Sequence, residues 1–357
     1  MRLLTSYERF LSYFSDRYEI RFCRLDEADQ LVSFLQQYWK ADHALVRSRT
    51  LLDWQHKDEK NQRYNYAVAC HKKTHQFHAI AGFIPTTQFD PQIRQPMLWG
   101  ALWKAREDVN EPGLGILVDM YFNQSVPHSL SMGVGLSNQC VANHKSRHFS
   151  VGQMDQYFLL NQSMHSYRLC VPNGLGLGLR FQSTSDELME LDKATYLALE
   201  GSCFKKLVPY KSKQYYVRRY FDHPIYRYRF FAICRKKDPV AVLVLRTCEY
   251  EDRRCLRIVD YIGDGSELAG NGTLFQDLLV QENAEYIDFL CYGFSKEGLE
   301  SCGFLNSIGT GAIIPNYYEP FVQSSCNVAF SFPHEAPNKS LFVVKGDADQ
   351  DRPNIIL

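Results

Sequence analysis

The stretch Arg106-Glu107-Asp108-Val109-Asn110-Glu111-Pro112-Gly113-Leu114-Gly115 closes an apolar, strand-like run and leads into a helix-like run. Its glycines allow a tight turn that brings backbone N–H groups close to a ligand. The helix that follows adds the positive end of its dipole, so a phosphate or pyrophosphate fits there. The stretch has no Lys-Ser/Thr pair and no GxGxxG pattern, which argues against ATP or a dinucleotide. An ordinary tight connection between strand and helix is the alternative interpretation.

This turn belongs to a series of elements whose order occurs twice along the chain. In the first copy we expect strands at 64–70, 78–85 and 97–106, a helix at 116–123, a strand at 130–136 and a helix from Asn138. In the second copy we expect strands at 228–234, 240–247 and 255–262, a helix at 273–283, a strand at 286–292 and a helix from Ser295. Short helical stretches at 51–56 and 215–221 precede the two copies. Each copy therefore contains a βαβ unit within a mixed sheet.

The sequence thus predicts an α/β (α+β) fold of two tandem domains, each a mixed twisted sheet flanked by helices. The first predicted domain covers residues 1–170 and the second covers residues 212–357. Residues 171–211 are expected to link or bridge the two, with a helix-like stretch at 186–200. A length of 357 residues, 45% of them hydrophobic, suits two globular domains.

Composition argues against several classes of function. The 40 basic and 40 acidic residues balance, whereas a protein that binds nucleic acid usually carries a basic surplus. The 11 cysteines form no CxxC pair, which indicates reduced thiols of a cytosolic protein. The first residues lack the apolar stretch of a signal peptide, and no run approaches eighteen apolar residues. We therefore expect a cytoplasmic protein that is not inserted in a membrane.

Two acids lie inside apolar strands, and a buried carboxylate needs either a partner or a purpose. Asp260 and Asp288 are therefore candidates for a general base or an anchor for an amine or hydroxyl group. A satisfied structural hydrogen bond is the alternative for each. The loop at 263–272 is the counterpart of the turn at 106–115, but its two carboxylates would repel a pyrophosphate. The first turn is therefore preferred as the cofactor site, and the second is interpreted as a solvated loop.

The C-terminal tail contains Asp347, Asp349, Asp351 and Arg352. Such a charge run is typical of a solvated terminus. The strand-like residues 342–344 precede it, so an ordered tail that lines a polar pocket is the second interpretation. The histidine-rich segment 71–78 has the spacing of a metal tract, but its two lysines would oppose a cation, and no metal is expected.

The chain resembles the GNAT acetyltransferase superfamily, in the tandem form found among surface-polysaccharide biosynthesis proteins. The stretches that carry this resemblance are Ala81-Gly82-Phe83-Ile84-Pro85, Leu102-Trp103-Lys104-Ala105-Arg106-Glu107-Asp108, Pro112-Gly113-Leu114-Gly115, Gln281-Glu282-Asn283-Ala284-Glu285-Tyr286-Ile287-Asp288-Phe289, Ile313-Ile314-Pro315-Asn316-Tyr317-Tyr318-Glu319-Pro320-Phe321 and Asp349-Gln350-Asp351-Arg352-Pro353-Asn354. Together they span most of the chain from about residue 40.

The resemblance implies an acyl-CoA donor, with acetyl-CoA preferred. Its pyrophosphate would lie on Gly113, Leu114 and Gly115, and its pantetheine arm along the strand that ends at Arg106. Asn138 matches a polar residue that often opens the next helix. Many members carry a tyrosine on that helix that protonates the leaving thiolate, but residues 142–149 contain none. His144 or Lys145 is the substitute candidate.

The implied reaction is N-acylation of a nucleotide-linked amino sugar in O-antigen (lipopolysaccharide) or capsule biosynthesis, by direct attack of the amine on the thioester. The candidate bases are Asp260, Asp288 and His43, although His43 is also interpreted as a surface histidine. The acceptor would be bound by two aromatic residues, Trp54 and Tyr317, and by the acidic tail. The alternatives are a tandem-GNAT transferase that uses aminoacyl-tRNA and a non-catalytic assembly module. Formation of a homo-oligomer stays open.

Overall fold

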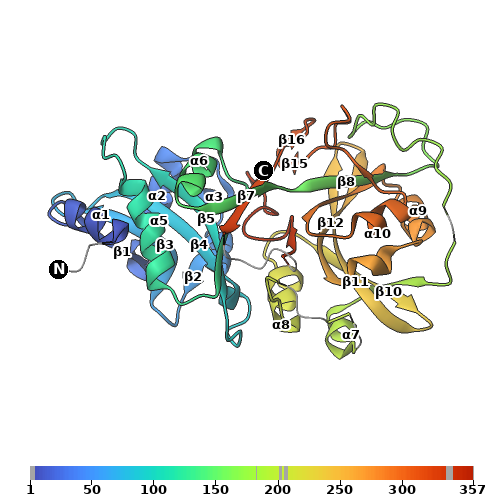
Figure 1. The fold of residues 1–357 in the computed structure, drawn as a ribbon, viewed down its shortest axis with the longest axis horizontal. Helices are drawn as coiled ribbons and strands as arrows, with labels where there is room; N and C mark the ends of the chain where they lie inside the picture. The colour runs from blue at the N-terminus through green and yellow to red at the C-terminus, as the bar shows by residue number, and fades with distance from the viewer. Residues whose placement is uncertain (1–4, 182, 201–202, 205–207, 335–340, 357) are drawn as a thin grey trace. The chain divides into compact units, whose positions relative to one another are not determined.

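The computed structural model describes residues 5–181, 183–200, 203–204, 208–334 and 341–356 (Figure 1). The chain forms two compact units. The first unit comprises Met1–Val134, Ser331–Pro333 and Pro353–Leu357, and the second comprises Gly135–Phe330 and His334–Arg352. The C-terminal part of the chain therefore contributes to both units.

The first unit is built on a mixed sheet with the strand order β1-β3-β4-β5-β6. These strands are β1 (Tyr18–Arg24), β3 (Arg63–His71), β4 (Phe77–Pro85), β5 (Met97–Ala105) and β6 (Leu130–Val134), and the short β2 (Lys57–Asp58) pairs with β3. Neighbouring strands are antiparallel from β1 to β5, whereas β5 and β6 run parallel.

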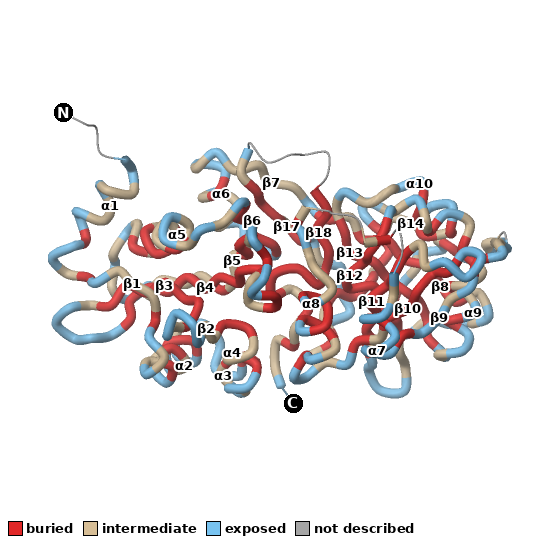
Figure 2. Tube along the Cα trace, turned by 90° about the horizontal axis from the view of Figure 1, so that it is seen from below, coloured by how far each residue is buried: buried red, intermediate tan, exposed pale blue. Residues whose placement is uncertain are grey.

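Helices cover both faces of this sheet, with α2, α3 and α4 on one side and α5 on the other (Figure 2). They are α1 (Ser6–Phe14), α2 (Ala28–Tyr38), α3 (Ala44–Arg47), α4 (Arg49–His56) and α5 (Leu114–Ser125). Successive side chains of β3 point to opposite faces of the sheet, as in any β-strand. Tyr66 and Val68 pack with α2–α4, whereas Ala67 and Ala69 pack with α1 and α5.

The second unit contains a mixed sheet with the order β14-β8-β13-β12-β11-β10-β9. Its strands are β8 (Asp155–Leu160), β9 (Glu187–Leu191), β10 (Tyr228–Arg235), β11 (Asp238–Tyr250), β12 (Arg253–Gly263), β13 (Tyr286–Tyr292) and β14 (Leu305–Asn306), and β18 (Val343–Val344) pairs with β13. Strands β12 and β13 are parallel, as are β5 and β6 in the first unit.

The remaining elements of the second unit are α6 (Asn138–Ser146), β7 (Phe149–Gln153), α7 (Lys193–Ala198), α8 (Lys213–Tyr216), α9 (Gly272–Gln281), α10 (Lys296–Ser301) and the hairpin of β15 (Tyr317–Tyr318) and β16 (Phe321–Val322). Strand β17 (Ala329–Pro333) has residues in both units. The main core lies between the sheet and helices α9 and α10, and includes Phe275, Leu279 and Leu299.

The predicted fold class is confirmed, because each unit holds a mixed sheet flanked by helices. The helix expected over 186–200 is wrong in its first half, where residues 187–191 form strand β9 and only α7 is helical. Residues 171–211, expected to link or bridge the halves, lie in the second unit. This segment contains β9, which pairs with β10, so part of the segment belongs to the second sheet.

Candidate functional site

In the first unit, a parallel strand pair separates just before the predicted anion site. Strands β5 and β6 pair from Met97 with Leu130 to Gly100 with Gly133. The last five residues of β5, 101–105, continue without β6, and four of these five are partly exposed. Among the described residues, no strand other than β6 pairs with this side of β5. The open side of β5 therefore leads along the strand to the turn at 106–113.

The turn ends at helix α5, whose N-terminus carries no side-chain cap. Gly113 is the N-cap residue and has a positive φ of 90°, which glycine adopts without steric cost. No acidic residue lies in the first helical turn. The three acids of the preceding turn are each paired with a cation, in the ion pairs Glu107–Lys104 (2.6 Å), Asp108–Arg106 (2.8 Å) and Glu111–Arg17 (2.6 Å). The positive end of the helix dipole is thus not opposed by an unpaired carboxylate of this turn.

Aromatic and core side chains pack against residues 113–115 of this turn. A Cβ atom on Gly113 would lie 2.5 Å from the ring of Phe10, a residue of α1. Leu114 is fully buried in the core, and the carbonyl oxygen of Gly115 accepts a hydrogen bond from the Trp103 indole N–H (2.8 Å). The Leu114 N–H donates to the Glu111 carbonyl (3.1 Å), so this turn can offer an anion the backbone N–H groups of Gly113 and Gly115.

The equivalent place in the second unit is filled by the C-terminal tail. Strands β12 and β13 pair in parallel only from Leu256 to Ile258. Beyond this point β18 pairs with β13, the Lys345 N–H donates to the Leu290 carbonyl (3.1 Å), and the Gly346 N–H donates to the Val259 carbonyl (2.7 Å). The tail thus enters the space where the two parallel strands diverge.

The start of α9, the counterpart of the α5 terminus, is also covered. A Cβ atom on Gly272 would lie 2.6 Å from the ring of Phe181 and 2.5 Å from the Cys302 carbonyl oxygen. The side-chain amide of Asn271 donates to Asp186 (3.1 Å). Both helix starts therefore lie against an aromatic ring, Phe181 here and Phe10 at Gly113, and the inserted tail is what distinguishes the second unit.

A buried ionic cluster joins the tail to the second sheet. Lys211 donates to Asp260 (2.7 Å) and forms an ion pair with Asp347 (2.8 Å), and both carboxylates are fully buried. The Tyr220 hydroxyl also donates to Asp260 (2.6 Å). Burial, followed by the neighbouring carboxylate of Asp260, raises the pKa of Asp347 to about 6 although Lys211 opposes the shift.

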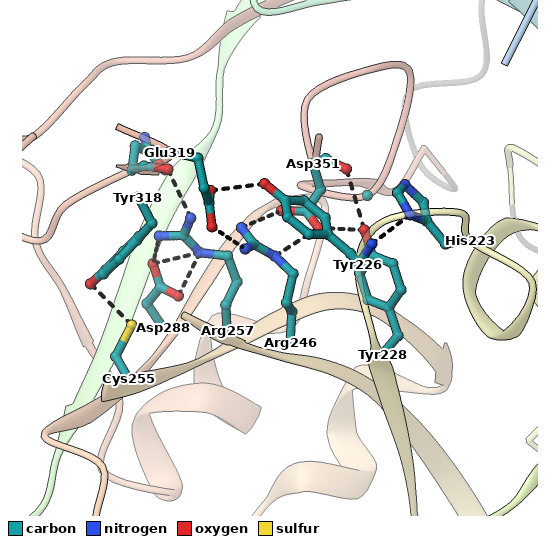
Figure 3. Close-up of polar contacts among 12 residues, drawn as sticks. His223, Tyr226, Tyr228, Arg246, Cys255, Arg257, Asp288, Tyr318, Glu319 and Asp351 are labelled. Carbon is teal, nitrogen blue, oxygen red and sulfur yellow. Dashed lines mark hydrogen bonds and ion pairs between the residues drawn. The ribbon is translucent and has the colours of Figure 1, made fainter. Parts of the chain in front are cut away.

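Two buried arginines bind the other acids of this region (Figure 3). Arg257 and Asp288 are directly opposite in the β12–β13 register and form a two-pronged ion pair, with a shortest distance of 2.7 Å. Arg246 pairs with Asp351 (3.1 Å), which also accepts from the Tyr228 hydroxyl (2.7 Å). Burial alone would raise the pKa of Asp351, but Arg246 and then Lys345 lower it to about 2.

The structure thus brings Asp260, Asp288, Asp347 and Asp351 into one buried region of the second unit, and the tail is ordered rather than solvated. Asp349 is buried as well and pairs with Arg352 (3.1 Å). Tyr317 lies in β15, where the Lys345 ammonium sits 5.4 Å from its ring. Burial, followed by Arg257, lowers the pKa of Lys345 to about 8.

The other predicted site residues lie elsewhere. His43 is buried and its ring nitrogen Nδ1 accepts from the Leu45 N–H (3.3 Å) at the start of α3, so it is not a surface histidine. Trp54 packs against the core beneath α2–α4 and against the ring of Phe89. Arg106 pairs with Asp108 at the end of β5. Asn138 opens α6 as expected and is exposed.

Sequence reasoning missed the cations Lys211, Arg246, Arg257 and Lys345. The signal for two of them was present, because Arg246 and Arg257 lie within apolar strands just as Asp260 and Asp288 do. A charged residue of either sign in such a strand needs a buried partner. Among the residues that the structure describes, no group of three or more His, Cys, Asp or Glu side chains could hold a metal ion. None of the described helices is long and apolar enough to cross a membrane.

No family model and no curated protein sequence matches the chain, but solved structures do. A GCN5-related N-acetyltransferase from Anabaena variabilis superimposes with a TM-score of 0.53 at 10% identity, over 88% of this chain and 72% of that chain. A putative acetyltransferase from Pyrococcus horikoshii gives a TM-score of 0.50 at 9% identity, over 95% of this chain and 93% of that chain. The chain has the GNAT fold. At this identity the likeness concerns the fold, and the predicted GNAT-type architecture is confirmed.

Proposed function

We propose that the chain is an acyl-CoA-dependent N-acyltransferase that binds its donor on the first unit. One observation carries this proposal. Strand β5 separates from β6 and leads to an uncapped helix start whose neighbouring acids are all paired, within a GNAT fold. A diphosphate is attracted to such a helix start by the dipole and the backbone N–H groups.

The second unit supports the same assignment by contrast. Its diverging strands hold the chain's own tail at Lys345 and Gly346, whereas in the first unit no described strand pairs with β5 beyond Gly100 on the side of β6. A donor that needs this space would have to displace buried residues. We therefore assign one acyl-CoA to each chain, with the pyrophosphate at Gly113–Gly115 and the pantetheine arm along β5 toward Arg106.

The acceptor in this proposal is the amine of a nucleotide-linked amino sugar, and the acyl group is acetyl. A neutral amine is a good nucleophile, so attack on the thioester needs correct placement more than a strong base. Of the predicted bases, Asp288 and Asp260 already accept hydrogen bonds from buried partners. That arrangement favours structural roles for these two acids.

Release of the CoA thiol tests the proposal. The purified chain is incubated with acetyl-CoA and a panel of nucleotide-linked amino sugars, and free thiol is measured against a matched panel of N-acetylated sugars. We expect thiol release with at least one free amine and none with the blocked amines. Binding of acetyl-CoA without turnover on any amine would support the non-catalytic alternative. Tight binding of tRNA with no binding of CoA would support the aminoacyl-tRNA alternative.

A further inference from the structure

A cavity of about 340 Å³ lies in the second unit, apart from the turn proposed to bind the donor. Its described lining residues come from residues 200, 204 and 209–212, from α8, from the end of β12 and from Phe342. Five of its eleven described lining residues are aromatic: Phe204, Tyr210, Tyr216, Tyr261 and Phe342. A volume of this size is at the lower end of the range for small-molecule sites, about 300–1,000 Å³.

Two buried polar groups at this cavity retain hydrogen-bonding capacity. The side chain of Lys211 is 4% exposed, and its ammonium has three N–H donors, of which Asp260 and Asp347 use two. The Tyr216 residue is 6% exposed, and within the described part of the chain no residue hydrogen-bonds to its hydroxyl. Burial raises the pKa of Tyr216, so the hydroxyl stays protonated and can donate. The third N–H of Lys211 and the hydroxyl of Tyr216 are therefore available to a ligand in the cavity.

The charges around the cavity disfavour an ionic ligand. A phosphate would face the carboxylates Asp260 and Asp347 behind Lys211, and Glu200 at the wall. A cation would face Lys211 and Lys213. Because charges of both signs surround the cavity, a neutral ligand is the kind that none of them repels. A purely apolar ligand would strip water from the Lys211 ammonium and the Tyr216 hydroxyl without replacing its hydrogen bonds.

We infer that this cavity binds a neutral sugar ring. The apolar face of a pyranose can stack on the tyrosine and phenylalanine rings, and its hydroxyl groups can accept from Lys211 and Tyr216. The inference concerns the second unit alone and stands whether or not the first unit transfers an acyl group.

Ligand-observed NMR with the neutral sugars D-glucose and N-acetyl-D-glucosamine as probes, on the full chain without CoA, tests this inference. Tyr216→Phe removes one hydroxyl and keeps the ring, so we expect affinity for D-glucose to fall about three- to tenfold, as for the loss of one hydrogen bond. Ile262→Phe adds volume at the cavity wall and should abolish binding. Tyr13→Phe makes the same chemical change on an exposed residue of the first unit and should leave binding unchanged.

The melting temperature of each variant shows that it is folded. Saturable binding that is weakened by Tyr216→Phe and by Ile262→Phe but not by Tyr13→Phe supports the inference. Absence of saturable binding of either sugar to the wild-type chain overturns it, as does equal binding by all variants. Binding of phenol without binding of either sugar would assign the cavity to an apolar aromatic ligand and also overturn the inference.

Discussion

Replacing Asp288 with asparagine should unfold the second unit at a lower temperature, because this carboxylate neutralises a buried guanidinium. Asp288 is fully buried and receives Arg257 through both oxygens, at 3.0 and 2.7 Å. Arg257 also donates to the carbonyl oxygens of Pro315 (2.6 Å) and Asn316 (2.8 Å), which fix it in place. Asparagine keeps the shape of the side chain but leaves the arginine charge without its counter-charge.

Breaking a buried ion pair by removing one partner costs about 3–5 kcal/mol. The second unit has 215 residues, and in a domain of this size each kcal/mol lowers the melting temperature by about 2–4 °C. We therefore expect Asp288→Asn to lower the melting temperature of the second unit by about 6–20 °C. Differential scanning calorimetry measures this shift directly.

The control is Glu300→Gln, which breaks an exposed pair with Lys296 on α10. Exposed pairs at this spacing contribute about 0.3–0.5 kcal/mol, so the melting temperature should change by about 2 °C or less. An Asp288→Asn chain that melts like the wild type but has lost acyl transfer would refute the structural role. It would return Asp288 to the role of a catalytic base.

Three further predictions concern the tail, each measured by urea unfolding. Asp351 has a folded pKa of about 2, below its ordinary value of 3.8, so its carboxylate stabilises the fold by about 2 kcal/mol above pH 4. This contribution is lost as the pH falls toward 2. A contribution that is the same at pH 3 and pH 5, measured against Asp351→Asn, would contradict this. Asp347 has a raised folded pKa of about 6, so its contribution should fall as the pH rises from 4 to 6, and Asp347→Asn should remove that slope. Gly346→Ala would place a Cβ atom 2.2 Å from the Tyr220 hydroxyl oxygen and 2.8 Å from the Val259 carbonyl oxygen, so it should cost at least about 1 kcal/mol; wild-type stability would show that the tail does not lie there.

Local patterns were sufficient to predict most strands and helices around the two turns. The strands expected at 64–70 and 228–234 and the helix at 116–123 are observed within a few residues, because apolar periodicity and glycine positions are local properties. Strand β9 was missed because it is short and mostly exposed, so it lacks apolar alternation. Strand β1 does alternate, as Tyr18-Glu19-Ile20-Arg21-Phe22, and could have been found from that pattern.

The buried ionic region could not be predicted from local sequence. Arg246 and Asp351 are 105 residues apart in the chain, and nothing near Asp351 distinguishes a buried carboxylate from a solvated one. The tail was therefore left with two interpretations, and only the pairing of β18 with β13 decides between them. Phe10, which covers one face of Gly113, comes from a helix that was not predicted.

The central claim, that the first unit binds the acyl-CoA donor, is tested most directly by calorimetric titration of acetyl-CoA. The titration uses the wild-type chain and two variants at Ile116, a half-buried residue in the first turn of α5. Ile116→Glu places a carboxylate beside the proposed diphosphate. Its repulsion of each of two phosphate charges at about 6 Å in water is about 0.7 kcal/mol, so binding should weaken at least about tenfold. Ile116→Gln has the same size without the charge. We expect one acetyl-CoA per wild-type chain, similar affinity for Ile116→Gln and much weaker binding for Ile116→Glu. Two molecules per chain, no binding, or equal affinity for both variants would contradict the placement of the donor on the first unit.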